Sequence, residues 1–164
     1  MIETNTQTTN ATLCFIINNE NILLINKKRG FGEGKINGPG GKVKQTESII
    51  TGAIRETFEE TGIQPKNLLK KAILDFYFGN TKSPKWKVHV FTSSKYVGEL
   101  IETEEARGEW IKIDEIPYDL MWEDDKYWLP KILSGELLKG TFWFSADMKK
   151  LISHKLEHVT GFDY

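Results

Sequence analysis

Three glutamates near the centre of the chain have the spacing of neighbours on one face of a helix. Glu56 precedes Glu59 by three residues and Glu60 by four. Like charges so placed each destabilise a helix by roughly 0.2 to 0.5 kcal/mol, and acids in the last turns also oppose the helix dipole. Clustered carboxylates without a nearby His or Cys suit Mg²⁺ or Mn²⁺ rather than zinc. The acids therefore predict a divalent metal site, with a solvated acidic face as the alternative for the glutamates alone.

The residues around these glutamates favour the metal site. From Gly41 the chain reads Gly-x5-Glu-x7-Arg-Glu-x2-Glu-Glu-x-Gly and reaches Gly62. This pattern resembles the Nudix box at every charged and glycine position, and on that ground the chain is identified as a member of the Nudix hydrolase superfamily. One position departs, because Thr57 stands where the family has a bulky aliphatic side chain. We expect slightly weaker packing there, without loss of the metal site.

The resemblance implies a fold, a reaction and a set of ligands. The fold is an α/β/α sandwich with a mixed β-sheet, in which a loop-helix-loop motif carries the box. The reaction is hydrolysis of a phosphoric anhydride, with Mg²⁺ as the expected cofactor and Mn²⁺ as the alternative. Arg55 would hold the ligand carboxylates in place by pairing with Glu59 or Glu47, and spacing leaves open which glutamate is the general base. The implied catalytic and metal-binding residues are Glu56, Glu59, Glu60, Glu105 and the carbonyl of Gly40.

Residues outside the box resemble one branch of the family, the vertebrate-type 8-oxo-dGTP diphosphatases. The resemblance implies hydrolysis of oxidised purine nucleoside triphosphates to the monophosphate and pyrophosphate, which clears damaged nucleotides from the pool. The alternatives are a Nudix hydrolase for another diphosphate, such as a nucleotide sugar or the 5′ end of RNA, and a catalytically silent Nudix-fold binding module. The matching segments run from Thr12 to about Leu156 and include Lys27-Lys28-Arg29-Gly30-Phe31-Gly32, Asn37-Gly38, Val88-His89-Val90-Phe91, Met121-Trp122, Asp124-Asp125 and Tyr127-Trp128.

The same resemblance implies how a nucleotide is bound. A purine gains roughly 1 to 3 kcal/mol by stacking on an aromatic ring, and carboxylates accept hydrogen bonds from N–H groups of the base. Taken alone, each aromatic residue is better explained as core packing, and Asp124 is also explained as a helix N-cap. The implied substrate-binding residues are Thr12, Lys27 and Asn37 for the nucleoside and sugar, Phe31, Phe76, Phe78, Trp122 and Trp128 for the base pocket, Asp124 and Asp125 for the base edge, and Pro39, Gly40, Gly41 and Lys42 in the loop before the helix.

Two details bear on which base is bound. Asp124 and Asp125 crowd one apolar pocket, so we expect them to share a proton, with at least one pKa raised by burial and mutual repulsion. Ile36 and Pro39 replace aromatic residues that the resemblance leads us to expect. The preference among oxidised guanine, oxidised adenine and methylated guanine nucleotides therefore stays open.

Hydrophobic periodicity predicts the elements that position these residues. On the central helix an apolar arc is expected to face the core; it consists of Ile49, Ile50, Ala53, Ile54 and Phe58. Turn residues and β-rich runs place the strands. The expected elements are a hairpin of strands 12–18 and 21–26, a glycine-rich loop 29–41, a helix 46–61 ended by Gly62, strands 71–78, 86–96 and 109–113, a helix 125–133, and terminal strands 138–145 and 151–159.

The composition limits the classes of function. A length of 164 residues fits one domain, placed at 1–164 with 1–11 flexible. The chain has 22 basic and 23 acidic residues. This balance gives no excess of positive charge for binding polymeric nucleic acid or an anionic membrane. A single cysteine, Cys14, excludes an intrachain disulfide. Neither an apolar run of about 18 residues nor a secretory signal is present, so a cytoplasmic monomer acting on a small nucleotide is the expectation.

Overall fold

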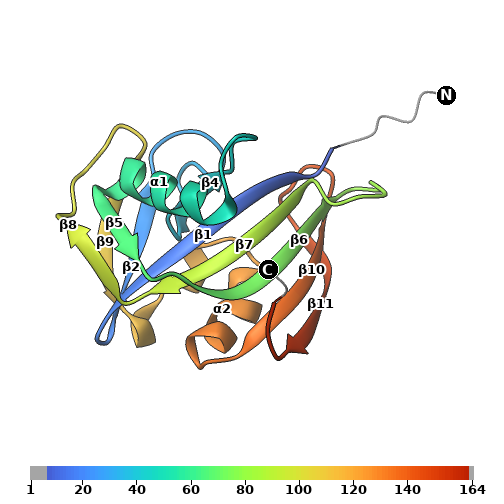
Figure 1. Cartoon of the computed structure of the whole chain (residues 1–164). Helices are drawn as coiled ribbons and strands as arrows, with labels where there is room; N and C mark the ends of the chain where they lie inside the picture. Colours follow the sequence, from blue (N-terminus) through green and yellow to red (C-terminus); the bar gives the residue numbers. More distant parts are fainter. Residues whose placement is uncertain (1–6, 163–164) are drawn as a thin grey trace.

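A mixed β-sheet forms the centre of the computed structural model, which describes residues 7–162 (Figure 1). Its strands are β1 (Thr9–Asn18), β2 (Asn21–Lys27), β3 (Ile36–Asn37), β4 (Gly40–Lys42), β6 (Leu69–Phe78), β7 (Trp86–Ser93), β9 (Ala106–Lys112), β10 (Leu137–Phe144) and β11 (Leu151–Val159). They lie in the order β11-β10-β6-β7-β1-β2-β3, with β4 paired to β1 and β9 to β2. A second sheet pairs β5 (Ile63–Lys66) with β8 (Lys95–Gly98).

The strand pairing confirms the expected mixed sheet. β1 runs parallel to β7, and β6 runs parallel to β10, whereas β6 and β7 are antiparallel. The predicted hairpin is β1 and β2, joined by a turn in which Asn19 has a φ of 56°. The two terminal strands pair antiparallel as β10 and β11. β1 lies in the middle of the sheet, between the two helices, because it pairs in parallel with β7, a strand distant in sequence.

The helices α1 (Ile49–Thr61) and α2 (Asp125–Leu133) cover opposite faces of the sheet. Cys14 of β1 packs with Ala53 of α1, whereas its neighbour Phe15 packs with Trp128 of α2. Successive side chains of a strand point to opposite faces, so the two contacts lie on opposite sides. This arrangement is the expected α/β/α sandwich.

The ends of α1 follow from two residues. Ser48 is the N-cap, and its hydroxyl accepts a hydrogen bond from the Thr51 amide at 3.1 Å. The helix therefore begins three residues later than the predicted start at Thr46. Its C-terminus is as predicted, because Gly62 adopts the left-handed conformation with a φ of 78°.

The predicted core face of α1 is partly wrong. Ile50 and Phe58 are 43% and 54% exposed, whereas the fully buried residues of the last turns are Thr57, Glu60 and Thr61. The two threonines are buried at little cost because their hydroxyls donate to the carbonyls of Ala53 and Thr57, at 2.7 and 2.6 Å. The helix is thus rotated so that Thr57, Glu60 and Thr61 turn toward the sheet in its last turns, whereas Ile50 and Phe58 of the predicted apolar arc turn away.

Several other boundaries differ from the sequence predictions, and those of β7 and β1 are two of them. The single strand expected over 86–96 is two strands, since β7 ends at Ser93 and β8 continues in the other sheet. The Ser93 hydroxyl donates to the carbonyls of Lys66 and Lys95, which fixes the chain at this change of sheet. The flexible start predicted for 1–11 is wrong from Thr9 onward, where β1 begins, and residues 1–6 lie outside the described residues.

Within residues 7–162, neither helix has the length and apolar character needed to span a bilayer. The helix α2 has the predicted bounds 125–133. Trp128, Leu129 and Ile132 pack into the main hydrophobic core. This packing fixes the start of α2, where Asp124 and Asp125 lie, against the sheet.

Candidate active site

The carboxylates of α1 lie against the short strand β4. A Cβ on Gly40 would overlap the backbone of Thr12, and a Cβ on Gly41 would lie 2.5 Å from the carboxyl carbon of Glu56. Any side chain at these two positions would therefore displace β1 or Glu56. The glycines of the predicted loop are needed for this close approach of backbone to carboxylate.

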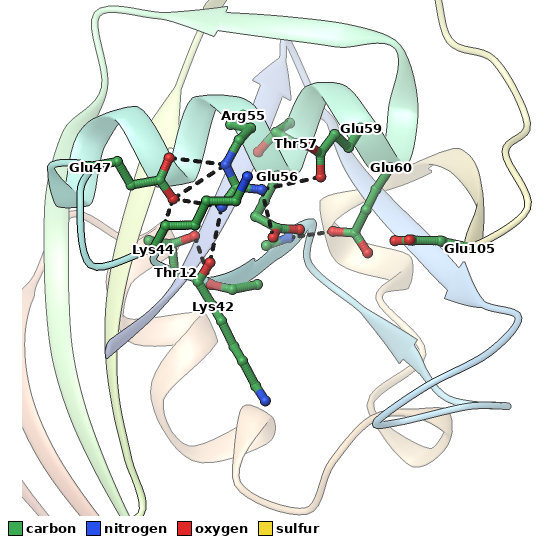
Figure 2. A network of polar contacts seen from close by, with 12 residues as sticks. Thr12, Lys42, Lys44, Glu47, Arg55, Glu56, Thr57, Glu59, Glu60 and Glu105 are labelled. Atoms are coloured by element: carbon green, nitrogen blue, oxygen red, sulfur yellow. Dashed lines mark hydrogen bonds and ion pairs between the residues drawn. The ribbon is translucent and has the colours of Figure 1, made fainter. Parts of the chain in front are cut away.

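Arg55 organises the outer part of the acidic cluster (Figure 2). Its guanidinium donates to Glu47 at 2.6 and 3.0 Å, to Glu56 at 2.9 Å and to Glu59 at 3.2 Å. It also donates to the carbonyl of Lys42 at 3.1 Å. The hydrogen bonds from Arg55 lower the pKa of Glu47 to about 2, and the same contacts raise the pKa of Arg55. Sequence spacing left Glu47 and Glu59 as alternative partners of Arg55, and the structure shows both.

Glu60 is held separately, at the inner end of the cluster. Its side chain is fully buried; the Gly40 amide donates to Oε1 at 2.8 Å, and the Lys27 ammonium lies 3.3 Å from Oε2. Burial raises the pKa of Glu60 to about 7, against the opposing effect of Lys27. Burial also raises the pKa of Glu56, and the negative charges of Glu59 and Glu105 add to that increase. The acids thus repel one another electrostatically, as the sequence predicted.

Glu105 reaches the cluster from the loop before β9. Its side chain points toward Glu60 in Figure 2, and its Oε1 lies 3.8 Å from the guanidinium of Arg29. Glu59 is about half exposed. The four predicted carboxylates therefore occupy one region, but each is engaged by a cation or an amide of this chain.

A cavity of about 440 Å³ extends from these carboxylates to the start of α2. Glu59, Glu105, Pro39 and Trp128 are the predicted site residues that do not line it. Trp86 and Phe144 line it although the sequence did not single them out. The predicted residues that line it are Thr12, Lys27, Phe31, Asn37, Gly40, Gly41, Lys42, Glu56, Glu60, Phe76, Phe78, Trp122, Asp124 and Asp125.

Aromatic rings form the end of the cavity away from the glutamates. Phe31 stacks on Trp122 with centroids 5.1 Å apart and planes 16° apart, and its ring also lies 5.8 Å from that of Trp86. Phe76 and Phe78 contact Phe144 from the neighbouring strand. A flat apolar base has stacking partners on several sides of this space.

The structure places Trp128 outside the lining of the cavity, unlike the other aromatic residues predicted for the base pocket. Trp128 is fully buried in the core beside Phe15, and its indole Nε1 donates to Asp124 Oδ2 at 2.8 Å. Its hydrophobic bulk and its spacing four residues after Asp124 explain both contacts, because i and i+4 side chains meet on a helix. Trp128 therefore positions Asp124 and does not contact the cavity.

Asp124 and Asp125 are buried side by side at 3% and 7% exposure. Asp124 occupies the N-cap position of α2, but its side chain makes no capping hydrogen bond, so capping does not explain it. Burial raises the pKa of both carboxyls; the charge of Asp124 raises that of Asp125 further, while the Trp128 hydrogen bond opposes the rise at Asp124. The interaction between the two carboxyls lowers the pKa of Asp124 and raises that of Asp125, which fits one shared proton carried mainly by Asp125.

We expect Trp128→Phe to lower the free energy of unfolding by roughly 1 to 3 kcal/mol, because it leaves a small cavity and an unpaired buried acceptor on Asp124. Chemical denaturation monitored by far-UV circular dichroism measures the change. The matched control is Trp143→Phe, since Trp143 lies on β10 and stacks on Tyr77 away from the cavity. A loss at position 128 no larger than that at 143 would contradict the role given to Trp128.

Comparisons with known proteins identify the family. Residues 7–132 match the NUDIX domain. This chain belongs to the Nudix family. The oxidized purine nucleoside triphosphate hydrolase of Mus musculus is 39% identical over 152 residues, covering 92% of this chain and 96% of the mouse protein. The protein of the same name from Danio rerio is 40% identical over 149 residues, covering 90% and 94%. The crystal structure of the MutT protein from Bacillus halodurans has a TM-score of 0.80 at 32% identity and covers 91% of this chain and 97% of its own.

The chain is accordingly a Nudix hydrolase, and enzymes of this family generally need divalent metal ions and act on small nucleotides. The candidate metal ligands of this chain suit a hard cation, because all of them are oxygen atoms. Gly41 has no side chain and so leaves room for the Glu56 carboxylate. Within residues 7–162, no three His, Cys, Asp or Glu side chains already converge as a metal-binding group.

Proposed function

We propose that this Nudix hydrolase cleaves oxidised purine nucleoside triphosphates of the 8-oxo-dGTP type, with Mg²⁺ as the cation. The observation that carries the proposal is the buried pair Asp124 and Asp125 at the aromatic end of the cavity. Glu56 and Glu60 lie at the other end of the same cavity. A carboxyl pair that shares one proton offers both a donor and an acceptor to the edge of a base. The names of the mouse and zebrafish relatives agree with this substrate class.

The residues at the two ends of the cavity have separate roles. We infer that the aromatic end fixes the base, which places the phosphate chain along Gly40, Gly41 and Lys42 toward the acids. Arg55 keeps two of the acids oriented, and the Gly40 amide orients Glu60. All these groups come from one chain, so a monomer suffices.

The proposed metal site consists of Glu56, Glu59, Glu60, Glu105 and the Gly40 carbonyl. A cation held there supplies neutralisation of charge on the phosphates during transfer. Water attacks the β-phosphorus and gives up a proton to a carboxylate of the cluster. The bond from the β-phosphorus to the oxygen that bridges it to the α-phosphorus breaks. That oxygen leaves on the nucleoside monophosphate, and the β- and γ-phosphates leave as pyrophosphate.

The products test this proposal directly. With 8-oxo-dGTP and Mg²⁺ we expect 8-oxo-dGMP and pyrophosphate as first products, with ¹⁸O from labelled water found in the pyrophosphate. Chromatography and mass spectrometry measure both. A parallel panel of dGTP, ADP-ribose and a nucleotide sugar identifies the substrate class. Inorganic phosphate as the first product, or faster turnover of a sugar-linked diphosphate, would contradict the proposal.

A further inference from the structure

Trp86 is the first residue of β7 and faces the active-site cavity. Its Cα partner on β6 is Phe76, which also lines the cavity. Its ring lies 5.8 Å from that of Phe31, and the ammonium of Lys42 lies 5.2 Å from the centre of the indole. Trp86 therefore belongs to the aromatic end, beside the strand that leads to the carboxylates.

The indole N–H of Trp86 is buried without an acceptor. Among the described residues, three buried side-chain nitrogen or oxygen atoms lack a hydrogen bond, namely Asp75 Oδ1, His89 Nδ1 and Trp86 Nε1. Of these three residues, only Trp86 lines the active-site cavity. A buried donor left unpaired destabilises the folded protein, so its presence here needs an explanation.

The groups that lie against the indole are movable. Phe31 is 53% exposed and lies between Gly30 and Gly32, both with positive φ near 80–90°. The ammonium groups of Lys42 and Lys85 lie over the ring, 5.2 and 6.0 Å from its centre, on flexible side chains. Displacing Phe31 or one of these lysines does not require the sheet to move.

Several other polar groups of the cavity are already engaged. The Asn37 amide nitrogen donates to the carbonyl of Lys35 at 3.2 Å, and Lys27 pairs with Glu60. Asp124 and Asp125, which share one proton, offer one donor beside their acceptor oxygens. The Trp86 N–H is thus a donor without a protein partner at the aromatic end.

We propose that the indole N–H of Trp86 donates a hydrogen bond to a carbonyl oxygen of the substrate base and so selects purines that carry an added oxo group. An oxidised purine differs from its parent by one more carbonyl acceptor, and its binding would satisfy the buried donor. The discrimination arises because a parent purine leaves the N–H unpaired. This inference rests on the proposed substrate class and adds a second donor to the one that the Asp124 and Asp125 pair offers.

The test is Trp86→Phe, which keeps an aromatic ring and removes the donor. We expect kcat/KM for 8-oxo-dGTP to fall roughly ten- to a hundredfold, and kcat/KM for dGTP to fall by less than about threefold. Calorimetric binding of 8-oxo-dGMP and dGMP should show the same selective loss. The control is Trp143→Phe, the same replacement on the far side of β10, which should leave the ratio unchanged.

An isosteric replacement separates the hydrogen bond from packing. With 3-benzothienylalanine at position 86, sulfur replaces the N–H in a ring of nearly the same shape, and the same selective loss is expected. Wild-type preference for 8-oxo-dGTP in this variant, or an equal loss for both nucleotides, overturns the role of Trp86. A wild-type enzyme with no preference for 8-oxo-dGTP overturns the proposed function, and the inference with it.

Discussion

Replacing Glu60 by Gln is expected to lower kcat/KM for 8-oxo-dGTP by roughly 10²- to 10⁴-fold while the fold persists. Glutamine retains an oxygen that can accept the Gly40 amide hydrogen bond, now 2.8 Å long. It removes the charge that faces Lys27 and that would contact the cation. Glu56→Gln should have a similar effect, because Glu56 is the other carboxylate of α1 that lines the cavity. Turnover is measured as pyrophosphate release over a range of Mg²⁺ concentrations.

The control for both variants is Glu115→Gln, because Glu115 is exposed and does not line the cavity. It should retain wild-type kinetics. Circular dichroism and thermal melting establish that each variant is folded. Activity of either α1 variant within about tenfold of wild type would contradict the metal-binding role assigned to these glutamates. Loss of the fold in Glu60→Gln would instead assign Glu60 a role in stabilising the core.

The acidic helix was predictable because the spacing of its charges is a local property of the sequence. Gly62 after the last turn gave the helix end, and Ser48 could have given its start as an N-cap. Which side of the helix is buried is not determined by the local sequence. The helical periodicity of apolar residues predicted that Ile50 and Phe58 lie in the core, but Glu60 and Thr61 are buried instead. Hydrogen bonds from β4 and within the helix satisfy these polar groups, and such partners are invisible to hydrophobic periodicity.

The base pocket was predictable only where a resemblance supplied it. Phe31 and Trp122 meet across ninety residues of sequence, and their stacking depends on the packing of a loop against the start of α2. Trp86 was missed because a tryptophan at the start of a β-rich run is equally typical of core packing. The placement of Trp128 outside the lining of the cavity was missed for the reverse reason, since its resemblance to a pocket residue did not reveal that its indole turns back to Asp124.

The structure makes the environments of the Asp124 and Asp125 carboxyls unequal. The Trp128 N–H donates to Asp124, which favours the ionised form of that carboxyl, and the charge of Asp124 then raises the pKa of Asp125. We therefore expect Asp125 to be the protonated member and Asp124 to be the acceptor. Raising the pH removes the shared proton, so KM for 8-oxo-dGTP should increase as the pH rises above the raised pKa values of the pair.

The two Asn variants should therefore differ. Asp125→Asn keeps a donor and an acceptor, much like a protonated carboxyl, and should lower kcat/KM for 8-oxo-dGTP by about tenfold or less. Asp124→Asn replaces the charged acceptor with a neutral amide, and we expect a larger loss of roughly ten- to a hundredfold, mainly through KM. Steady-state kinetics on 8-oxo-dGTP and dGTP measure both, with Mg²⁺ dependence recorded to show that the metal site is unchanged.

The control for this pair is Asp119→Asn, which changes an exposed acid on the segment before α2. It should leave the preference for the oxidised base intact, which separates base recognition from a general loss of negative charge. The pH profile provides a second measurement, because both Asn variants lack the shared carboxyl proton and should lose the increase in KM at high pH. If neither Asp variant changes the preference for 8-oxo-dGTP over dGTP, the acids only stabilise the start of α2 through Trp128. The proposed substrate would then lose the observation that carries it.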